Sequence, residues 1–238
     1  MKGYIGGGGL RQGNLKDEDF PPVVTPYSAT RSVQDTGSPI YASVDLGFNA
    51  LVGPDFRLGV FAGFHYLNEQ VSAFGCTQLA FNTDVCAPPF MIPDQFRVIT
   101  QTNNWYSARI GVDATVEFDC FRLTVDAAWL PYVSLYGFDT HWLRVGTDPG
   151  DFIGPITDDG KGWGYQLEAF LSYRVYEWLN VGIGGRYWSM QTHGATRFDN
   201  HVVGVIAFPQ PVDWKVQNYG VFLQASLKLG PYSVIDVH

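Results

Sequence analysis

Two short runs of ionisable residues offer acid/base chemistry. The run Asp17-Glu18-Asp19 holds two carboxylates two positions apart, and the run Asp139-Thr140-His141 holds a carboxylate two positions from an imidazole. Side chains two apart share a face of an extended segment. One run therefore presents a carboxylate pair, and the other presents an imidazole that a neighbouring carboxylate orients and makes more basic. Such groups favour hydrolysis by an activated water, without a covalent intermediate.

The ionisable residues of these two runs also have interpretations other than acid/base catalysis. Acidic residues in exposed loops are usually solvated, and the run Phe198-Asp199-Asn200-His201 repeats the F-D-x-H pattern of residues 138–141. A metal site built from His141, His193 and His201 with the acidic pair is a further alternative, although the sequence has no compact ligand motif for it.

The elements that must position these groups are strands. Residues 40–52 alternate apolar and polar side chains almost without interruption, which is typical of a strand with two different faces. The same period recurs in six further segments and in a short stub at the start of the chain, at 56–74, 104–117, 121–136, 163–175, 179–192, 216–229 and 1–9. The sequence therefore predicts an all-β, antiparallel, up-and-down β-barrel of eight strands, a single domain over residues 1–238.

The predicted connections alternate between short and long. Tight turns fall at 53–55, 118–120 and 176–178, and long loops fall at about 10–38, 75–103, 137–162 and 193–214. Short turns on one rim and long loops on the other are typical of outer-membrane barrels. Both acid/base runs then lie in long loops on opposite walls of one mouth. Eight strands about 4.8 Å apart and tilted by about 40° enclose a diameter of roughly 16 Å, which leaves room for an extended peptide and a water.

The charged face of the strands distinguishes a membrane barrel from a lipocalin-like soluble one. Opposite the apolar series lie charges of both signs, at Asp45, Arg57, Arg109, Asp113, Arg122, Asp126, Glu168, Arg174, Arg186 and Lys228. This face is too polar for a dry core, so we expect the apolar face to meet lipid. Two aromatic belts are expected at the lipid interfaces, with Trp105, Tyr106, Trp163 and Trp214 near the long loops and Phe118, Phe121, Tyr176 and Trp178 near the turns.

Composition limits the partners. A net charge of -8 argues against nucleic acid and favours cationic partners. The longest near-continuous apolar run, residues 202–208, is far shorter than the roughly 18 residues of a membrane-spanning helix.

The cysteines leave two alternatives. Cys76 and Cys86 either close a small disulfide or stay free, and Cys120 is left single.

Several segments together resemble the omptin family of outer-membrane aspartyl-type proteases. They are GNLKDEDF at 13–20, YASVDL at 41–46, GPDFRLGVFAGF at 53–64, DTH at 139–141 and the last strand at 219–229, so the resemblance covers most of the chain. It implies that Asp17, Asp19, Asp139 and His141 are catalytic, and it selects Asp139 and His141 over Asp199 and His201. It also implies peptide or protein substrates and a Gram-negative outer membrane, with the active rim outside the cell. Lipopolysaccharide is expected to be required for activity, and no cofactor is implied.

The chain departs from the family pattern at three places. Omptins have ten strands, and Met1 falls where their third strand begins, so we expect this chain to be N-terminally incomplete relative to the family. Gly137 stands where the family has an acidic residue that helps to accept a basic side chain. The last strand continues into a tail at 230–238. We expect an outer-membrane endopeptidase. The alternative is a non-enzymatic barrel with a binding or structural role, and a small pore is a third option that a lumen filled by side chains disfavours.

Overall fold

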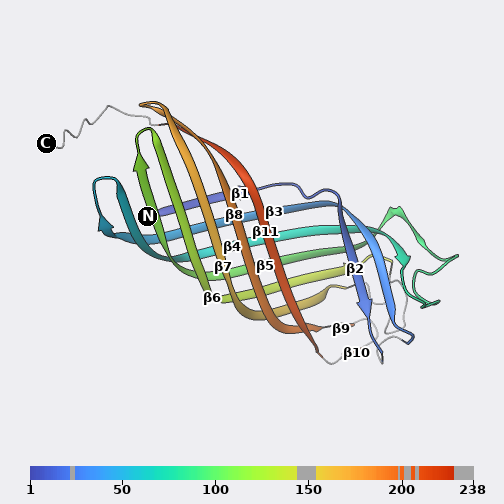
Figure 1. The fold of residues 1–238 in the computed structure, drawn as a ribbon. Helices are drawn as coiled ribbons and strands as arrows, with labels where there is room; N and C mark the ends of the chain where they lie inside the picture. Colours follow the sequence, from blue (N-terminus) through green and yellow to red (C-terminus); the bar gives the residue numbers. More distant parts are fainter. Residues whose placement is uncertain (22–24, 144–153, 198, 201–204, 207–208, 228–238) are drawn as a thin grey trace.

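The structure is a computed structural model that describes residues 1–21, 25–143, 154–197, 199–200, 205–206 and 209–227. One antiparallel sheet contains nine strands: β1 (Lys2–Gly7), β2 (Gly13–Asp19), β3 (Ser28–Val52), β4 (Phe56–Gln78), β5 (Ile92–Phe118), β6 (Phe121–His141), β7 (Ile156–Tyr176), β8 (Leu179–Arg197) and β11 (Gln210–Leu227). A separate two-stranded sheet joins β9 (Asp199–Asn200) to β10 (Val205–Ile206). The sheet order is β1-β3-β4-β5-β6-β7-β8-β11, so the predicted up-and-down antiparallel topology is confirmed (Figure 1). Among the described residues, no helix is long and apolar enough to cross a membrane.

The prediction of eight strands was wrong by one. The predicted N-terminal stub corresponds to β1, but a second short strand, β2, follows it, and both pair with β3. Gly7 pairs with Ile40 and Gly13 with Gln34, and a bridge between Leu10 and Gly37 lies between the two pairings. The sequence of β2, GNLKDED, has one apolar side chain, Leu15, among polar and charged ones, and hydrophobic periodicity therefore did not reveal this strand.

The predicted long loops were also too long, because the strands continue through much of them. The three tight turns are confirmed, but β4 continues to Gln78, β5 begins at Ile92 and β6 continues to His141. These outer parts of the strands carry polar residues on both faces, which removes the alternation on which the prediction depended. Asp17 and Asp139 consequently lie in strands rather than in loops. The predicted tail at 230–238 lies outside the described residues.

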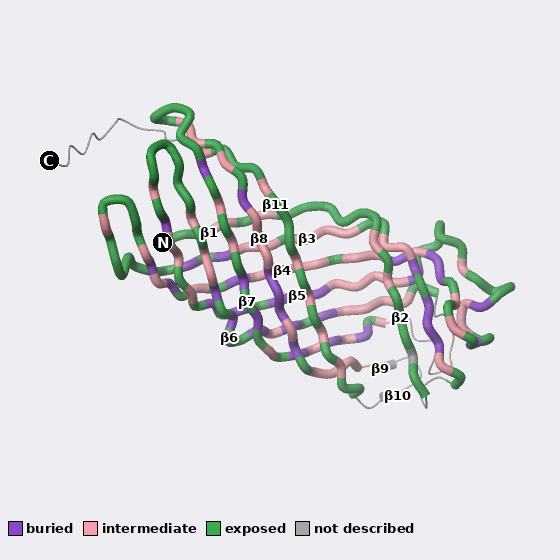
Figure 2. Tube along the Cα trace, in the orientation of Figure 1, coloured by how far each residue is buried: buried purple, intermediate pink, exposed green. Residues whose placement is uncertain are grey.

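The two faces of the sheet have the predicted polarity. Along β3, Val44, Leu46 and Phe48 are exposed, whereas Ser43 and Asp45, which alternate with them, are buried. Figure 2 shows how buried and exposed positions interleave along the central strands. The concave side therefore holds the polar side chains and the convex side holds the apolar ones.

The interior contains an ionic layer. The Arg109 guanidinium, 3% exposed, lies 3.2 Å from Asp45 Oδ2 and 3.1 Å from Asp126 Oδ1. Asp126 also pairs with Lys2 from the edge strand β1. These contacts join β1, β3, β5 and β6 across the concave side, so charges of opposite sign compensate one another there.

An apolar layer, which the sequence did not predict, lies between the ionic layer and the outer ends of the strands. It consists of the fully buried side chains of Leu67, Trp105, Leu130, Val133, Leu135 and Met190, with Trp214 packed against it. Trp105 and Trp214 were therefore wrongly assigned to an outer aromatic belt, whereas Tyr106 and Trp163 are exposed as predicted. Adjacent strand residues point to opposite faces, so Trp105 and Tyr106 cannot share a belt.

The strands β1 and β11 are the two edges of the sheet. Side chains connect the two sides across the interior: the rings of Tyr4 and Trp188 stack at 6.3 Å, and Asn218 Nδ2 donates to Glu69 Oε1 at 3.4 Å. Backbone pairing between β1 and β11 does not occur among the described residues, so closure of the barrel stays a prediction.

A disulfide fixes the connection between β4 and β5. Cys76 and Cys86 are bonded, with their Cα atoms 5.6 Å apart, which decides between the two alternatives for this pair. The Gln78 side chain accepts from the Ala29 amide and donates to Ser28 Oγ. The loop is therefore tied both to itself and to β3. Cys120 is free and exposed.

Candidate active site

Asp139 and His141 form a direct pair on the concave side of β6. His141 Nε2 lies 3.0 Å from Asp139 Oδ2, and the two side chains are 13% and 20% exposed. A carboxylate only accepts hydrogen bonds, so the Nε2 of a neutral His141 carries the proton and its Nδ1 keeps a lone pair. The pair thus has the arrangement of a general base held by an orienting carboxylate.

Neighbouring strands hold the end of β6 in place. His141 pairs with Ile99 of β5, and Asp139 pairs with Gln101 of β5 and Ile156 of β7. The next residue, Trp142, donates from its indole nitrogen to Thr100 Oγ1 at 2.9 Å. The Asp139 and His141 side chains are therefore presented by paired backbone, which restricts their movement.

The other acidic run lies on β2, and strand alternation separates its residues onto two faces. Lys16 and Glu18 share one face, where Lys16 Nζ lies 2.9 Å from Glu18 Oε1. Tyr27 donates its hydroxyl to Glu18, and this bond and the Lys16 ammonium lower the pKa of the Glu18 carboxyl. Asp17 points to the other face, in register with the buried Thr30 of β3. Asp19 is in register with Ser28, and its side chain lies outside the described residues.

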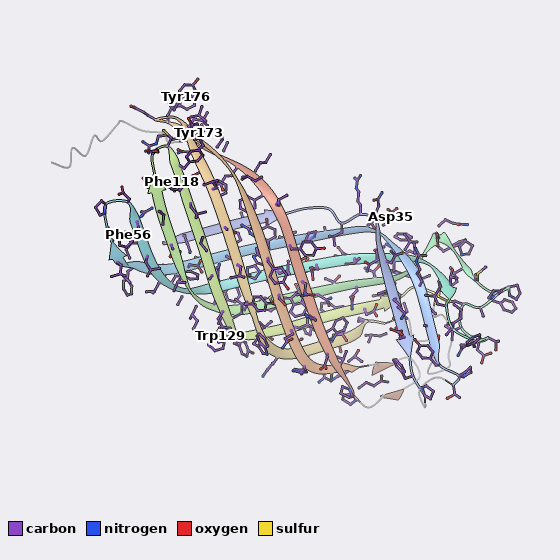
Figure 3. All side chains as sticks on the ribbon, in the orientation of Figure 1. Asp35, Phe56, Phe118, Trp129, Tyr173 and Tyr176 are labelled. Atoms are coloured by element: carbon purple, nitrogen blue, oxygen red, sulfur yellow. A yellow bond between two sulfur atoms is a disulfide. The ribbon has the colours of Figure 1, made fainter. Side chains whose placement is uncertain are left out.

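The bend of β3 sets the direction of β2. The β3–β4 register shifts between Gln34 and Thr36, next to Asp35, which Figure 3 labels at the bend. Such irregularities bend a strand. Figure 1 shows β2 running at an angle to β1, at the end of the sheet opposite the short turns. Because β3, β4 and β5 separate β2 from β6 in the sheet, groups on these two strands can meet only across its concave side.

A row of three residues next to Asp139 was not predicted. Gly137 of β6 pairs with Asn103 of β5 on one side and with Asp158 of β7 on the other. Asp158 is 2% exposed, and burial raises the pKa of its carboxyl; a hydrogen bond with Thr196 opposes this rise, and the negative charge of Asp139 adds to it. The segment around Asp158 was assigned to a loop, so only the strand register reveals this neighbour of the candidate pair.

The competing candidates lie elsewhere. His193 Nδ1 lies 2.5 Å from Asp213 Oδ1, but these side chains are 71% and 78% exposed on β8 and β11. His201 and the Asp199 side chain lie outside the described residues. Within the described part of the chain, no three His, Cys, Asp or Glu residues are grouped to hold a metal ion. His65 is buried, and its Nδ1 is hydrogen-bonded to Ser43 Oγ at 2.7 Å in the sheet interior.

Comparison with solved structures identifies the fold. Neither a protein-family model nor a curated protein sequence matches the chain. The chain is similar to the crystal structure of the outer membrane protease OmpT from Escherichia coli, with a TM-score of 0.66 and 19% sequence identity. The match covers 94% of this chain and 77% of OmpT. The antiparallel, up-and-down, all-β fold implied by the omptin resemblance is therefore confirmed, whereas closure of the barrel stays a prediction.

Proposed function

We propose that this chain is an outer-membrane endopeptidase of omptin type, in which Asp17, Asp19, Asp139 and His141 form the catalytic site. The observation that carries the proposal is the 3.0 Å contact between Asp139 and His141 on the concave side of a sheet with the fold of an outer membrane protease. A likeness in fold alone does not specify chemistry. The chemical reason for proposing hydrolysis is that the oriented imidazole of His141 lies at the same end of the sheet as β2, the strand that carries the acidic pair.

The outer face of the strands supports a place in the outer membrane of a Gram-negative bacterium. On β6, the exposed apolar series begins at Phe121 and reaches Trp129, a span of nine residues. This agrees with the 9–11 residues, roughly, that a tilted strand needs to cross a bilayer. In Figure 3, Phe118 and Tyr176 lie at the short-turn end and Trp129 lies further along the sheet, as two interfacial belts require. Asp139 is ten residues beyond Trp129, which supports a catalytic rim outside the lipid. This rim, opposite the short turns, is the proposed extracellular one.

The proposed reaction is hydrolysis of a peptide bond by water. His141 Nδ1 takes a proton from a water held between β2 and β6, and the water oxygen attacks the peptide carbonyl. Asp17 and Asp19 position this water, and a proton shared between them is donated to the developing oxyanion. His141 then passes its proton to the leaving amine as the C–N bond breaks, and the hydroxyl formed on the former oxyanion returns its proton to the Asp17 and Asp19 pair as the carbonyl re-forms. Asp139 keeps the imidazole oriented and stabilises its protonated form.

The interior and the charge of the chain indicate the kind of partner. The apolar layer fills the sheet interior between the ionic layer and the level of Gly137. Side chains packed in this way disfavour a conducting pore. The net charge of -8 favours cationic peptides or proteins as substrates. Lipopolysaccharide and outer-membrane lipid are the proposed surroundings of the apolar outer face.

Cleavage of a fluorogenic peptide library by the refolded protein, with and without lipopolysaccharide, tests this function. The parent is expected to cleave, and His141→Ala and Asp17→Ala are expected to lose about 10²-fold or more. His193→Ala removes the exposed imidazole and serves as the matched control, with parental activity expected. A folded parent that cleaves nothing would instead support the non-enzymatic barrel, and equal cleavage by all four proteins would overturn the assignment of these catalytic residues.

A further inference from the structure

The acidic strand β2 is attached to the sheet through one neighbour. Among the described residues, β2 pairs with β3 alone. Asp17 is in register with Thr30 of β3, and Thr30 is in register with Gln78 at the end of β4. Residues opposite one another on adjacent strands share a face of the sheet, so these three form one row across β2, β3 and β4. The placement of the acidic pair therefore depends on what holds the outer end of β3.

The side chain of Gln78 extends the β3–β4 ladder beyond the last residue of β4. The Ala29 amide donates to Gln78 Oε1 at 2.9 Å. The Ala29 carbonyl accepts from the Leu79 amide at 2.7 Å. Ala29 is buried, and a buried peptide group without partners is costly. The Gln78 carboxamide thus takes the place of a strand residue opposite Ala29, where β4 has already ended.

Every hydrogen-bonding position of this carboxamide is used. Its Oε1 also accepts from the Ala80 amide at 3.0 Å, and its Nε2 donates to Ser28 Oγ at 3.0 Å and to the Val85 carbonyl at 2.9 Å. A primary amide has two acceptor lone pairs and two N–H donors, so these three bonds and the bond from Ala29 complete its capacity. Two of the four partners belong to β3 and two to the β4–β5 loop. Gln78 therefore joins that loop to β3.

The β4–β5 loop is closed around this contact. The disulfide between Cys76 and Cys86 spans it, and the Cys86 carbonyl accepts from the Gln78 amide at 3.0 Å. Asn82 is 3% exposed, and its Nδ2 donates to the Pro26 carbonyl at 2.8 Å. The Oδ1 of the same side chain accepts from two backbone amides of the loop. The loop thus meets β3, and the residues just before it, as a hydrogen-bonded unit.

We propose that Gln78 is a positioning residue for the acidic pair: its carboxamide, held by the disulfide-closed loop, fixes the outer end of β3 and thereby β2 with Asp17 and Asp19. The consequence in turnover rests on the proposed endopeptidase function. Gln78 acts through the backbone of β3 and takes no part in bond breaking. Because a displacement of about 1 Å at a catalytic group can cost up to about 10²-fold in rate, loosening β2 slows the chemical step.

Hydrogen exchange of backbone amides, measured by mass spectrometry on the refolded protein, tests this attachment without turnover. Gln78→Met removes all four bonds of the carboxamide, and Gln70→Met makes the same change at an exposed position of β4. Residues 13–19 are expected to exchange at least about tenfold faster in Gln78→Met than in the parent, with residues 121–136 of β6 unchanged. Unchanged exchange at 13–19, or equal acceleration by Gln70→Met, would overturn the proposal.

Two further proteins make the test independent of a single substitution. Gln78→Glu keeps the two accepted bonds and loses the two donated ones, so an exchange rate between those of the parent and Gln78→Met is expected at residues 13–19. The double substitution Cys76→Ser and Cys86→Ser keeps the carboxamide and opens the loop, and faster exchange is expected in the same segment. Parental exchange in both proteins would overturn the proposal even if Gln78→Met failed to fold.

Steady-state kinetics separates positioning from a general loss of stability. Gln78→Met is expected to lower kcat about tenfold while KM changes less than about twofold. In an Asp17→Ala background the same change is expected to cost less than about twofold more, because the incomplete acidic pair no longer acts as a unit. A full additional loss in that background would show that Gln78 does not act through the pair. Faster exchange at residues 13–19 in a protein that cleaves nothing would uphold the attachment of β2 while the catalytic proposal failed.

Discussion

Asp139 Oδ2 and His141 Nε2 lie 3.0 Å apart on the same face of β6, at the end of a strand that is paired on both sides. The i, i+2 spacing brings the two side chains together because the segment is extended. Another Asp/His pair among the described residues, Asp213 and His193, instead joins two strands and is largely exposed. Of these two described pairs, Asp139 and His141 combine an oriented imidazole with a partly enclosed position.

Asp139→Asn is expected to reduce peptide cleavage by about 10²- to 10⁴-fold without unfolding the protein. An amide is neutral, so it no longer stabilises a protonated His141 or fixes which ring nitrogen carries the proton. Steady-state kinetics measures the loss, and circular dichroism confirms that the sheet is retained.

Asp213→Asn provides the matched control for this substitution. It makes the same chemical change in the exposed Asp/His pair, and parental kinetics are expected. If both variants lost activity equally, the specific assignment of Asp139 would be wrong.

Arg109→Met is expected to destabilise the folded protein by about 3–5 kcal/mol, because it leaves Asp45 and Asp126 buried without their cation. Arg122→Met removes an arginine whose side chain is 49% exposed and pairs with Glu117, and it is expected to cost less than about 1 kcal/mol. Urea unfolding in detergent micelles compares the two. Similar midpoints for both variants would show that the interior ion pairs are not integral to stability.

The double substitution Cys76→Ser and Cys86→Ser removes a bridge with a sequence separation of 10 and is expected to lower stability by about 2–3 kcal/mol. The effect is expected to be largest in the β4–β5 loop, so limited proteolysis of the folded variant should cut between residues 79 and 91. Cys120→Ser, which changes the free thiol, is the control. Equal resistance of all three proteins to cleavage would contradict a stabilising bridge.

Asp158→Asn is expected to increase stability at neutral pH. Burial raises the pKa of the Asp158 carboxyl, so its protonated form is favoured in the folded state. The stability linked to this group is fully present below the ordinary pKa of aspartate, about 3.9, and is lost as the pH rises through the raised pKa. Asparagine is neutral throughout, so the urea midpoint of the variant should exceed that of the parent at neutral pH and converge with it in acid. Parallel pH profiles would contradict the effect of burial.

The sequence predicted the fold where one face of each strand is apolar. In residues 40–52 the alternation identified both the strand and the face on which Asp45 is buried. It failed where the chain no longer alternates, so β2 and the outer ends of β4, β5 and β6 were assigned to loops. Hydrophobic periodicity reveals a strand only where one of its faces contacts an apolar phase. These segments lie outside that phase.

The candidate site was predictable only within each strand. The spacing of Asp139 and His141 is local and anticipated their contact. The position of Asp158 beside Gly137 depends on the β6–β7 register across a long connection, which no local pattern encodes. The apolar layer was missed for a similar reason, because Leu67, Leu135 and Met190 come from separate strands and meet only in the folded sheet.

The most direct test of the catalytic claim is mass spectrometry of a peptide cleaved by the refolded protein in ¹⁸O water with glycinamide added. Direct attack by an activated water predicts that each new carboxyl terminus carries one ¹⁸O atom and that none is capped by glycinamide, with product formation suppressed in Asp139→Asn. Fragments capped by glycinamide would reveal a covalent acyl-enzyme. Either that result or the absence of fragments from a folded parent would contradict the account.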